Sequence, residues 1–313
     1  MLPYVRARLF LALPTLLAVT LVTFFLGYLA PGSPIDLLVG QHADPAVRAR
    51  LEHEYGLDRP PLVRYLDFLR GALHGDLGRS FSNAGRPVSE LIAEQFPVTA
   101  FIACAAVLLA VMLGVPAGAL AALHHNRPAD RAVMGLVLLF VSMPAFVLAP
   151  ILMLLFALRL NWLPASGWEG VARPAFYLLP VAVLAARPAA LFARIMRASM
   201  LEVVRQDYIR TALAKGLTHG AAIRRHALKN AFLPVLTVIG SSFGYLLTGS
   251  FVVENIFSIP GIGYESVQSI LRRDYPVIQG VALLVAVVFI ALNLAVDLLY
   301  AAVDPRVRLQ GAR

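Results

Sequence analysis

Six long apolar stretches limit the folds open to this chain of 313 residues. They lie at about 9–30, 98–123, 132–157, 175–196, 231–253 and 279–301. Each is long enough for a helix to cross a bilayer, which takes about 20 residues. Only 14% of the residues are charged, against about 25% in a soluble domain. We therefore predict an all-α integral membrane protein with six transmembrane helices in a single membrane domain, residues 1–313.

The basic residues predict how the chain is oriented. With the N-terminus inside, the cytoplasmic segments hold fifteen Lys and Arg against four acids. The outer segments hold eleven against thirteen acids, and seven of those bases lie in the first loop, residues 31–97. Loops of that length largely escape the positive-inside rule. Both termini are predicted cytoplasmic, and the net charge of +9 indicates topology and no nucleic acid partner, because the spans divide the bases among separate segments.

Two segments outside the membrane are too long to be simple turns. The first loop is extracytoplasmic in this topology, and charged and apolar residues alternate at 45–55 and 62–73. This pattern favours short amphipathic helices on the outer surface. The second segment, residues 197–230, is basic and cytoplasmic, with good helix formers from Met200 to Lys215. Gly216 then predicts a C-cap that turns the chain, and a second helical stretch leads into the fifth span.

The second segment carries a specific motif. Residues 211–216, Thr-Ala-Leu-Ala-Lys-Gly, with Asn230 to Pro234 downstream, resemble the conserved cytoplasmic loop of ABC importer permeases. Where that family usually begins with Glu-Ala-Ala, this chain has Thr-Ala-Leu, a variant of the peptide and nickel branch. We call residues 197–230 the coupling loop, because in the family this loop docks on the ATPase subunit.

The resemblance extends over nearly the whole chain. Residues 56–81, 252–280 and 297–308 resemble, in that order, the first permease subunit of dipeptide and oligopeptide importers, the dipeptide-permease B type. The most diagnostic stretch combines Ile-Pro-Gly-Ile-Gly at 259–263 with Arg-Asp-Tyr-Pro at 273–276. The chain is thereby identified as a member of the dipeptide, oligopeptide and nickel importer family.

The resemblance implies a type I ABC importer permease fold in the bacterial inner membrane. The chain would form half of a translocation pathway for di- and oligopeptides, with a second homologous permease subunit as the other half. One or two cytoplasmic ABC ATPases would hold the ATP and Mg, and an extracytoplasmic solute-binding protein would deliver the cargo. No cofactor or metal is expected on this chain. Nickel chelates, glutathione, opines or haem remain alternative cargoes, as close relatives handle them.

The resemblance also implies three sets of site residues. ATPase coupling is expected in the coupling loop, although its charge alone also fits a solvated basic face near lipid headgroups. Pathway residues are expected in the fourth and fifth spans, where hydroxyl and small side chains equally fit helix packing, and where Arg187 equally fits an interhelical contact. Contact with the binding protein is expected after the fifth span, where Pro and Gly equally fit a rigid turn. The three sets are Asp207, Tyr208, Arg210, Thr211, Ala212, Ala214, Lys215 and Gly216; Ser241, Ser242, Gly244, Thr248 and Arg187; and Glu254, Pro260, Gly261, Gly263 and Asp274. In the second span, Gly114 and Gly118 predict close helix packing.

Enzyme chemistry finds little support. Ser242 lies in a literal G-x-S-x-G, but all seven histidines fall in predicted loops, so no base is placed to activate it. Lys215 and Lys229 follow Ala214 and Leu228, so neither belongs to a phosphate-binding loop. The contrasting hypothesis is an ion-driven secondary transporter, a class that commonly shows inverted repeats and broken helices; neither is evident in this sequence.

Overall fold

The computed structural model describes residues 2–30, 32, 34–35, 44–83 and 85–303. The described residues form two compact units. The first unit comprises those of Met1–Thr99 and Pro260–Leu294, and the second comprises Ala100–Ile259 with the described residues after Leu294. The prediction of a single membrane domain stays a prediction.

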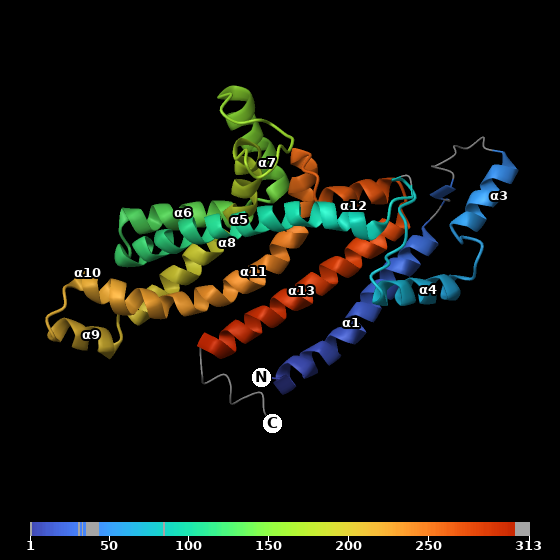
Figure 1. Ribbon diagram of the computed structural model, residues 1–313. Helices are drawn as coiled ribbons and strands as arrows, with labels where there is room; N and C mark the ends of the chain where they lie inside the picture. The colour runs from blue at the N-terminus through green and yellow to red at the C-terminus, as the bar shows by residue number, and fades with distance from the viewer. Residues whose placement is uncertain (1, 31, 33, 36–43, 84, 304–313) are drawn as a thin grey trace. The chain divides into compact units, whose positions relative to one another are not determined.

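Five helices of the described residues are long and apolar enough to cross a membrane. They confirm five of the six predicted spans, all of which are labelled in Figure 1. The second of these helices begins ten residues before the predicted second span, so it is longer than the stretch needed to cross a bilayer. The helices are α1 (Leu2–Leu29), α5 (Val88–Leu123), α8 (Ala175–Val203), α11 (Leu228–Phe257) and α13 (Tyr275–Val303).

The third predicted span differs from the expectation of one continuous helix. It consists of α6 (Pro128–Ser142), then α7 (Ala145–Leu152) continued by the π-helix η1 (Met153–Arg159), and the two limbs are bent by 110°. Met143 lies at the break in an extended conformation with ψ 115°. The cause is Pro144, because the residue before a proline is disfavoured in the helical region.

The first unit contains two short helices from the first loop, α3 (Pro45–Glu54) and α4 (Pro61–Leu73). Helix α4 is amphipathic, as predicted, and buries Tyr65 against α1. The Tyr65 hydroxyl lies 3.1 Å from Thr20 Oγ1, and its ring lies 5.3 Å from that of Phe24. Helix α3 is present but has no apolar face and no buried residue, so the prediction of amphipathic helices holds for α4 only.

In the second unit, α8 packs against α6, α7 and α11 (Figure 1). Helix α5 approaches α8 very closely, as the two glycines predict. A Cβ added to Gly114 would stand 2.3 Å from the Ala189 carbonyl oxygen, and one added to Gly118 would stand 2.2 Å from that of Ala193. Only glycine allows the backbones to come this near. The remaining elements are α9 (Asp207–Ala214), α10 (His219–Ala222) and the π-helix η2 (Ile223–Ala227) in the second unit, and α12 (Ile262–Leu271) in the first.

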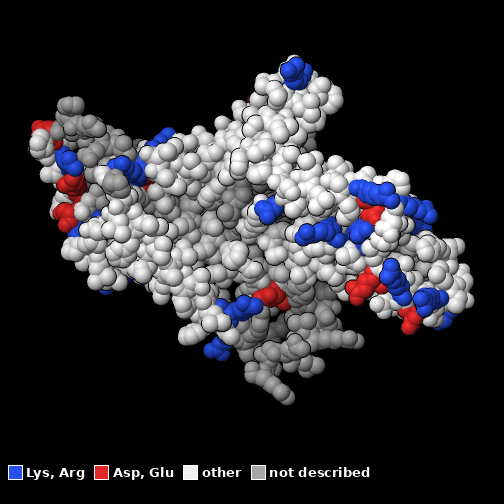
Figure 2. Space-filling view, turned by 180° about the vertical axis from the view of Figure 1, so that it is seen from behind, with Lys and Arg blue, Asp and Glu red and all other residues white. Residues whose placement is uncertain are grey.

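The surface is apolar over wide areas. Along α1, large side chains such as Phe10 and Leu29 are each 73% exposed. On the face drawn in Figure 2, charged residues gather in separate groups, with broad uncharged surface between them. A soluble monomer rarely exposes patches of this kind. The exposed side chains are therefore expected to contact lipid or partner subunits.

Candidate functional site

The coupling loop contains a short separate helix instead of the single helix predicted from Met200 to Lys215. Helix α8 continues to Val203, and α9 begins at Asp207 after a turn. Gln206, which precedes α9, is extended with ψ 149°. Asp207 stands in the first turn of α9, where a negative charge is favourable next to the helix dipole.

Gly216 ends α9 as the sequence predicted. Its φ of +90° is costly for a residue with a side chain. The Leu217 N–H donates to the Ala212 carbonyl over 3.2 Å, and the Gly216 N–H donates to the Leu213 carbonyl over 2.9 Å. These two bonds form a Schellman cap, which turns the chain sharply after α9.

Helix α9 is held on one side and open on the other. Ile209 and Ala212 are buried, with 2% and 9% of their surface exposed. Asn230 Nδ2 donates to the Tyr208 hydroxyl over 2.9 Å and so ties α9 to the start of α11. The rest of the predicted coupling set is exposed and available to a partner: Asp207, Tyr208, Arg210, Thr211, Ala214, Lys215 and Gly216. Contact with an ATPase stays a prediction.

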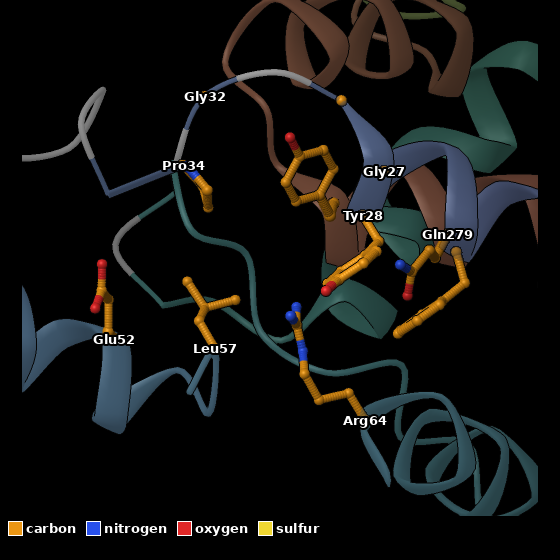
Figure 3. Close-up of a pocket in the computed structure, with 11 residues that line it drawn as sticks. Gly27, Tyr28, Gly32, Pro34, Glu52, Leu57, Arg64 and Gln279 are labelled. Atoms are coloured by element: carbon orange, nitrogen blue, oxygen red, sulfur yellow. The ribbon is translucent and has the colours of Figure 1, made fainter. Parts of the chain in front are cut away.

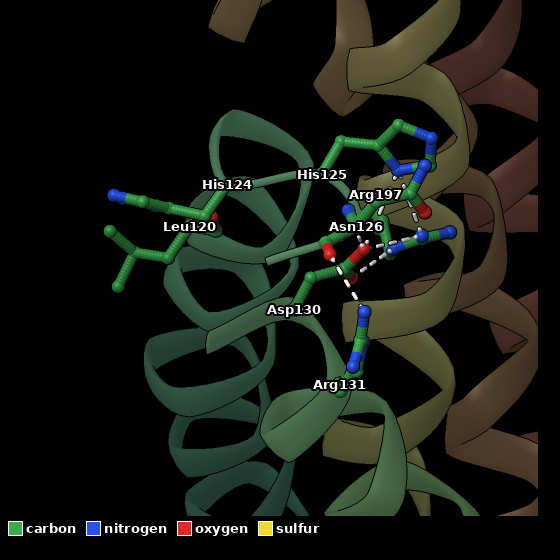
Figure 4. A network of polar contacts seen from close by, with 7 residues as sticks. All are labelled: Leu120, His124, His125, Asn126, Asp130, Arg131 and Arg197. Atoms are coloured by element: carbon green, nitrogen blue, oxygen red, sulfur yellow. Dashed lines mark hydrogen bonds and ion pairs between the residues drawn. The ribbon is translucent and has the colours of Figure 1, made fainter. Parts of the chain in front are cut away.

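A polar network near the end of α8 was not expected from the sequence (Figure 4). Asp130 lies in the first turn of α6 and is only 3% exposed. Its carboxylate accepts two hydrogen bonds from the Arg197 guanidinium, Nε to Oδ1 over 2.6 Å and Nη2 to Oδ2 over 2.8 Å. The Asn126 N–H donates to the same carboxylate over 2.9 Å, and His125 Nδ1 lies 3.4 Å from it. Bidentate pairs of this kind have defined geometry. The network therefore fixes α8, ten residues before α9 begins, to the turn between α5 and α6.

The predicted pathway residue Arg187 contacts another helix and is exposed as well. Its Nη1 donates to the Tyr245 hydroxyl over 2.8 Å, and its guanidinium carbon lies 4.7 Å from the centre of that ring. Tyr245 is 45% exposed. A charged side chain facing lipid at mid-span is costly, so this exposed pair favours a surface toward a water-filled path or a partner subunit. Tyr245 was missed by the sequence analysis, although it lies four residues after Ser241.

The small and hydroxyl residues of α11 differ in their exposure. Ser241 is exposed, whereas Ser242 is buried and donates to the Val238 carbonyl over 2.6 Å. Gly240 lies against Val296 of α13, where a Cβ would stand 2.3 Å from a methyl carbon. Gly244 is partly exposed. The Thr248 side chain lies outside the described residues. Packing thus explains Gly240 and Ser242, and the pathway prediction stays open for Ser241.

Asp274, predicted to contact a binding protein, is instead enclosed within the first unit. Its carboxylate is fully buried and accepts hydrogen bonds from both the N–H and hydroxyl of Ser82, from the Phe81 N–H and from the Ser80 hydroxyl, at 2.5–3.0 Å. Both carboxylate oxygens therefore accept hydrogen bonds, three at Oδ2 and one at Oδ1, which satisfies a buried charged group. Asp274 therefore anchors the end of the first loop at the start of α13, and any effect on docking would be indirect.

The other predicted outer residues lie in and around the turn between α11 and α12, with Glu254 in the last turn of α11 and Gly263 in the first turn of α12. Glu254, Gly261 and Gly263 are buried, and only Pro260 is exposed. The Ile262 N–H at the start of α12 donates to Thr99 Oγ1 over 3.0 Å. This arrangement agrees with a rigid turn, and a direct contact with a binding protein stays a prediction.

Comparisons with known proteins agree with these features. Residues 114–309 match the family described as binding-protein-dependent transport system inner membrane component, and residues 1–103 match the N-terminal model of the same transport systems. The oligopeptide transport system permease protein OppB of Escherichia coli K12 is 44% identical over 309 residues, covering 98% of this chain and 100% of the relative. The glutathione transport system permease protein GsiC of Salmonella choleraesuis is 42% identical, covering 98% and 99%.

Solved structures agree on the fold. A structure of the MetNI methionine ABC transporter in inward-facing conformations matches with a TM-score of 0.59 and 18% identity, covering 68% of this chain and 96% of that one. An amino acid ABC transporter with histidines matches with a TM-score of 0.52 and 20% identity, covering 70% and 94%. The fold is that of a type I ABC importer permease. The family match and the long apolar helices identify the chain as a multi-pass protein of the bacterial inner membrane.

Proposed function

The chain belongs to the family of binding-protein-dependent transport system inner membrane components, and on that premise we propose that it is one of two permease subunits of an ATP-driven importer of short peptides. The similarity to OppB over the full length of both chains supports the peptide cargo. The similarity to GsiC makes glutathione a second candidate cargo. In this proposal the chain is a transport subunit without catalysis of its own.

The observation that carries the proposal is the presentation of α9. An eight-residue helix, capped by a glycine at positive φ and anchored by two buried side chains, exposes its other side in the coupling loop. An exposed, rigidly held helix suits insertion into a groove of a partner. The partners in this proposal are one or two ATPases, which bind ATP and Mg, a second homologous permease and an extracytoplasmic solute-binding protein.

Coupling would run from α9 into the spans. Arg197 of α8 is fixed to Asp130 of α6, and Tyr208 of α9 is tied to Asn230 at the start of α11. A displacement of α9 by the ATPases would therefore act on α11 directly, while the ion pair holds α8 and α6 together. Packed helices transmit movements of this kind as discrete shifts.

The test uses an exposed position of α9. Ala214→Arg adds bulk and charge to the exposed side without touching the buried Ile209 or Ala212. We expect the chain to reach the membrane at its normal level, and to lose copurification with its ATPases and peptide uptake. The matched control is Ala49→Arg on α3, which is also exposed in a helix but lies on the predicted outer side. Full uptake and ATPase copurification in the Ala214→Arg protein would refute the docking role of α9.

A further inference from the structure

Two cavities lie beside α4 in the first unit, of about 290 Å³ and about 260 Å³. They share four lining residues, Phe24 of α1, Arg64 of α4, and Tyr275 and Gln279 of α13. Their volumes are just below the lower end of the roughly 300–1,000 Å³ range for pockets that hold small ligands. A ligand of a few residues fits this size, whereas a folded partner does not.

Arg64 brings a positive charge to both cavities. Among the described residues no carboxylate lies within ion-pair distance of its guanidinium, which stands 5.9 Å from the centre of the Phe24 ring. Burial lowers the pKa of Arg64, but an arginine stays protonated in a protein. In Figure 3 Arg64 extends from α4 toward Tyr28, with Gln279 on the α13 side of the same space. A half-buried cation without a counter-ion is costly, so this position favours an anionic ligand.

Two further polar groups in the cavities lack partners. Gln279 is 9% exposed, and its amide has no hydrogen bond within the described part of the chain. The Tyr275 hydroxyl is buried and also has no hydrogen-bond partner among those residues. Most buried polar groups in proteins are hydrogen-bonded, and exceptions call for an explanation. The buried Tyr275 hydroxyl has no surface open to a ligand, but the Gln279 amide and the Arg64 guanidinium around one space can together bind a carboxylate and a peptide backbone.

Carboxylates line other parts of both cavities. Glu52, which pairs with Arg48 at 3.1 Å, lines the first cavity, and the exposed Asp67 and Asp76 line the second. Asp67 forms ion pairs with Arg59 and Arg70 at 3.5 and 3.9 Å. Asp76 accepts a hydrogen bond from the Gly78 N–H. Apolar side chains complete the wall: Phe24, Phe68, Leu77 and Phe81. A cavity with one cation, two carboxylates and apolar walls complements a zwitterion with apolar side chains, and the carboxylates disfavour an anionic lipid headgroup.

We propose that these cavities form a binding site for a short peptide in its zwitterionic form, with Arg64 receiving the terminal carboxylate, Asp76 facing the ammonium group, and Gln279 bonding the backbone. The proposal rests on the proposed function, and it adds a peptide site in the predicted outer region of the permease itself. A peptide released by the binding protein would meet this site before it enters the path between the subunits.

The test measures binding of radiolabelled Ala-Ala to the full importer complex in nanodiscs of phosphatidylcholine, with the binding protein omitted. Competition by unlabelled Ala-Ala is compared with Ala-Ala amide, which lacks the carboxylate, and with N-acetyl-Ala-Ala, which lacks the ammonium. We expect each blocked peptide to compete at least 10-fold more weakly, since charge-assisted hydrogen bonds are the stronger kind. Equal competition by all three peptides in the wild-type complex would overturn the proposal.

Two variants assign the ends of the peptide. Arg64→Gln should bind Ala-Ala and its amide equally, and Asp76→Asn, whose side-chain oxygen can keep the hydrogen bond to Gly78, should bind Ala-Ala and its acetylated form equally. A preference for Ala-Ala over the blocked peptides that persists in both variants would refute the assignment of the two peptide ends. Displacement of Ala-Ala by phosphatidylglycerol, with no difference between free and blocked peptides, would assign the cavity to a lipid instead.

Uptake by the same complex with its binding protein separates this proposal from the proposed function. If the complex takes up peptide but Arg64→Gln still prefers Ala-Ala to its amide as the wild type does, the importer function stands and only the proposed binding site is overturned. Absence of ATP-dependent peptide uptake by the wild-type complex overturns the function on which the site rests.

Discussion

Replacing Asp274 by Asn tests how the end of the first loop is held. The buried carboxylate accepts four hydrogen bonds from Ser80, Phe81 and Ser82, three of them at Oδ2 and one at Oδ1. Asparagine keeps one acceptor oxygen, so at best it loses the bond from the Phe81 N–H and turns its own NH₂ toward that donor. The other three bonds lose the negative charge.

The magnitude follows from these bonds. A hydrogen bond to a charged group contributes about 1.5–3 kcal/mol, and a buried donor left unsatisfied costs about 1–3 kcal/mol. We expect the opening of residues 80–82 to become easier by about 3 kcal/mol, which is roughly a 100-fold change in the opening equilibrium.

Hydrogen–deuterium exchange with mass spectrometry measures this opening in the detergent-solubilised protein. The amides of Phe81 and Ser82 should exchange roughly 100-fold faster in Asp274→Asn. The control is Asp76→Asn, because Asp76 is exposed and its bond to the Gly78 N–H survives the change. Exchange at residues 80–82 that matches the wild-type rate in Asp274→Asn would refute the anchoring role.

Three further predictions concern the spans. Gly118→Val should destabilise the protein by about 1–3 kcal/mol through overpacking and so lower its thermal unfolding temperature. In the control Gly135→Val nothing lies within 4 Å of the added Cβ, so the unfolding temperature should change far less. Equal shifts in the two variants would contradict the close contact of α5 and α8. Asp130→Asn should destabilise the protein by about 1–3 kcal/mol in the same assay, because it removes the charge from a part-buried pair with Arg197. An unchanged transition would refute the role of this pair in holding α6 and α8 together. Arg187→Met should reduce peptide uptake by the complex while the amount of protein in the membrane is kept, and full uptake would remove Arg187 from the pathway.

Local patterns were sufficient for much of the fold. Apolar length predicted five spans within the described residues, because the cost of leaving backbone groups unpaired in lipid makes a long apolar segment helical whatever surrounds it. Gly216 was recognised as a cap because a positive φ is a property of one residue. The close approach at Gly114 and Gly118 was recognised for a similar reason, since their spacing places them on one side of a helix.

Other features escaped because they depend on partners far apart in the chain. Residues 189–206 contain no Gly or Pro, so the break at residues 204–206 gave no local signal. Pro144 is a local signal for the break in the third span, but that span was predicted from apolar length alone. Asp130 entered the sequence analysis only as a charge on the predicted cytoplasmic side, and Arg197 is 67 residues away from it.

The sequence by itself therefore determined the class of protein, the membrane spans and the family, since hydropathy and motifs are properties of contiguous residues. Only the tertiary structure decided which polar residues are buried and bonded within the chain and which remain exposed to a partner or ligand. It enclosed Asp274 and Ser242, exposed Arg187 and Ser241, and left Arg64 without a counter-ion among the described residues. The reason is physical, because burial and pairing arise when helices pack, and residues of identical chemistry then differ by the neighbours that packing gives them.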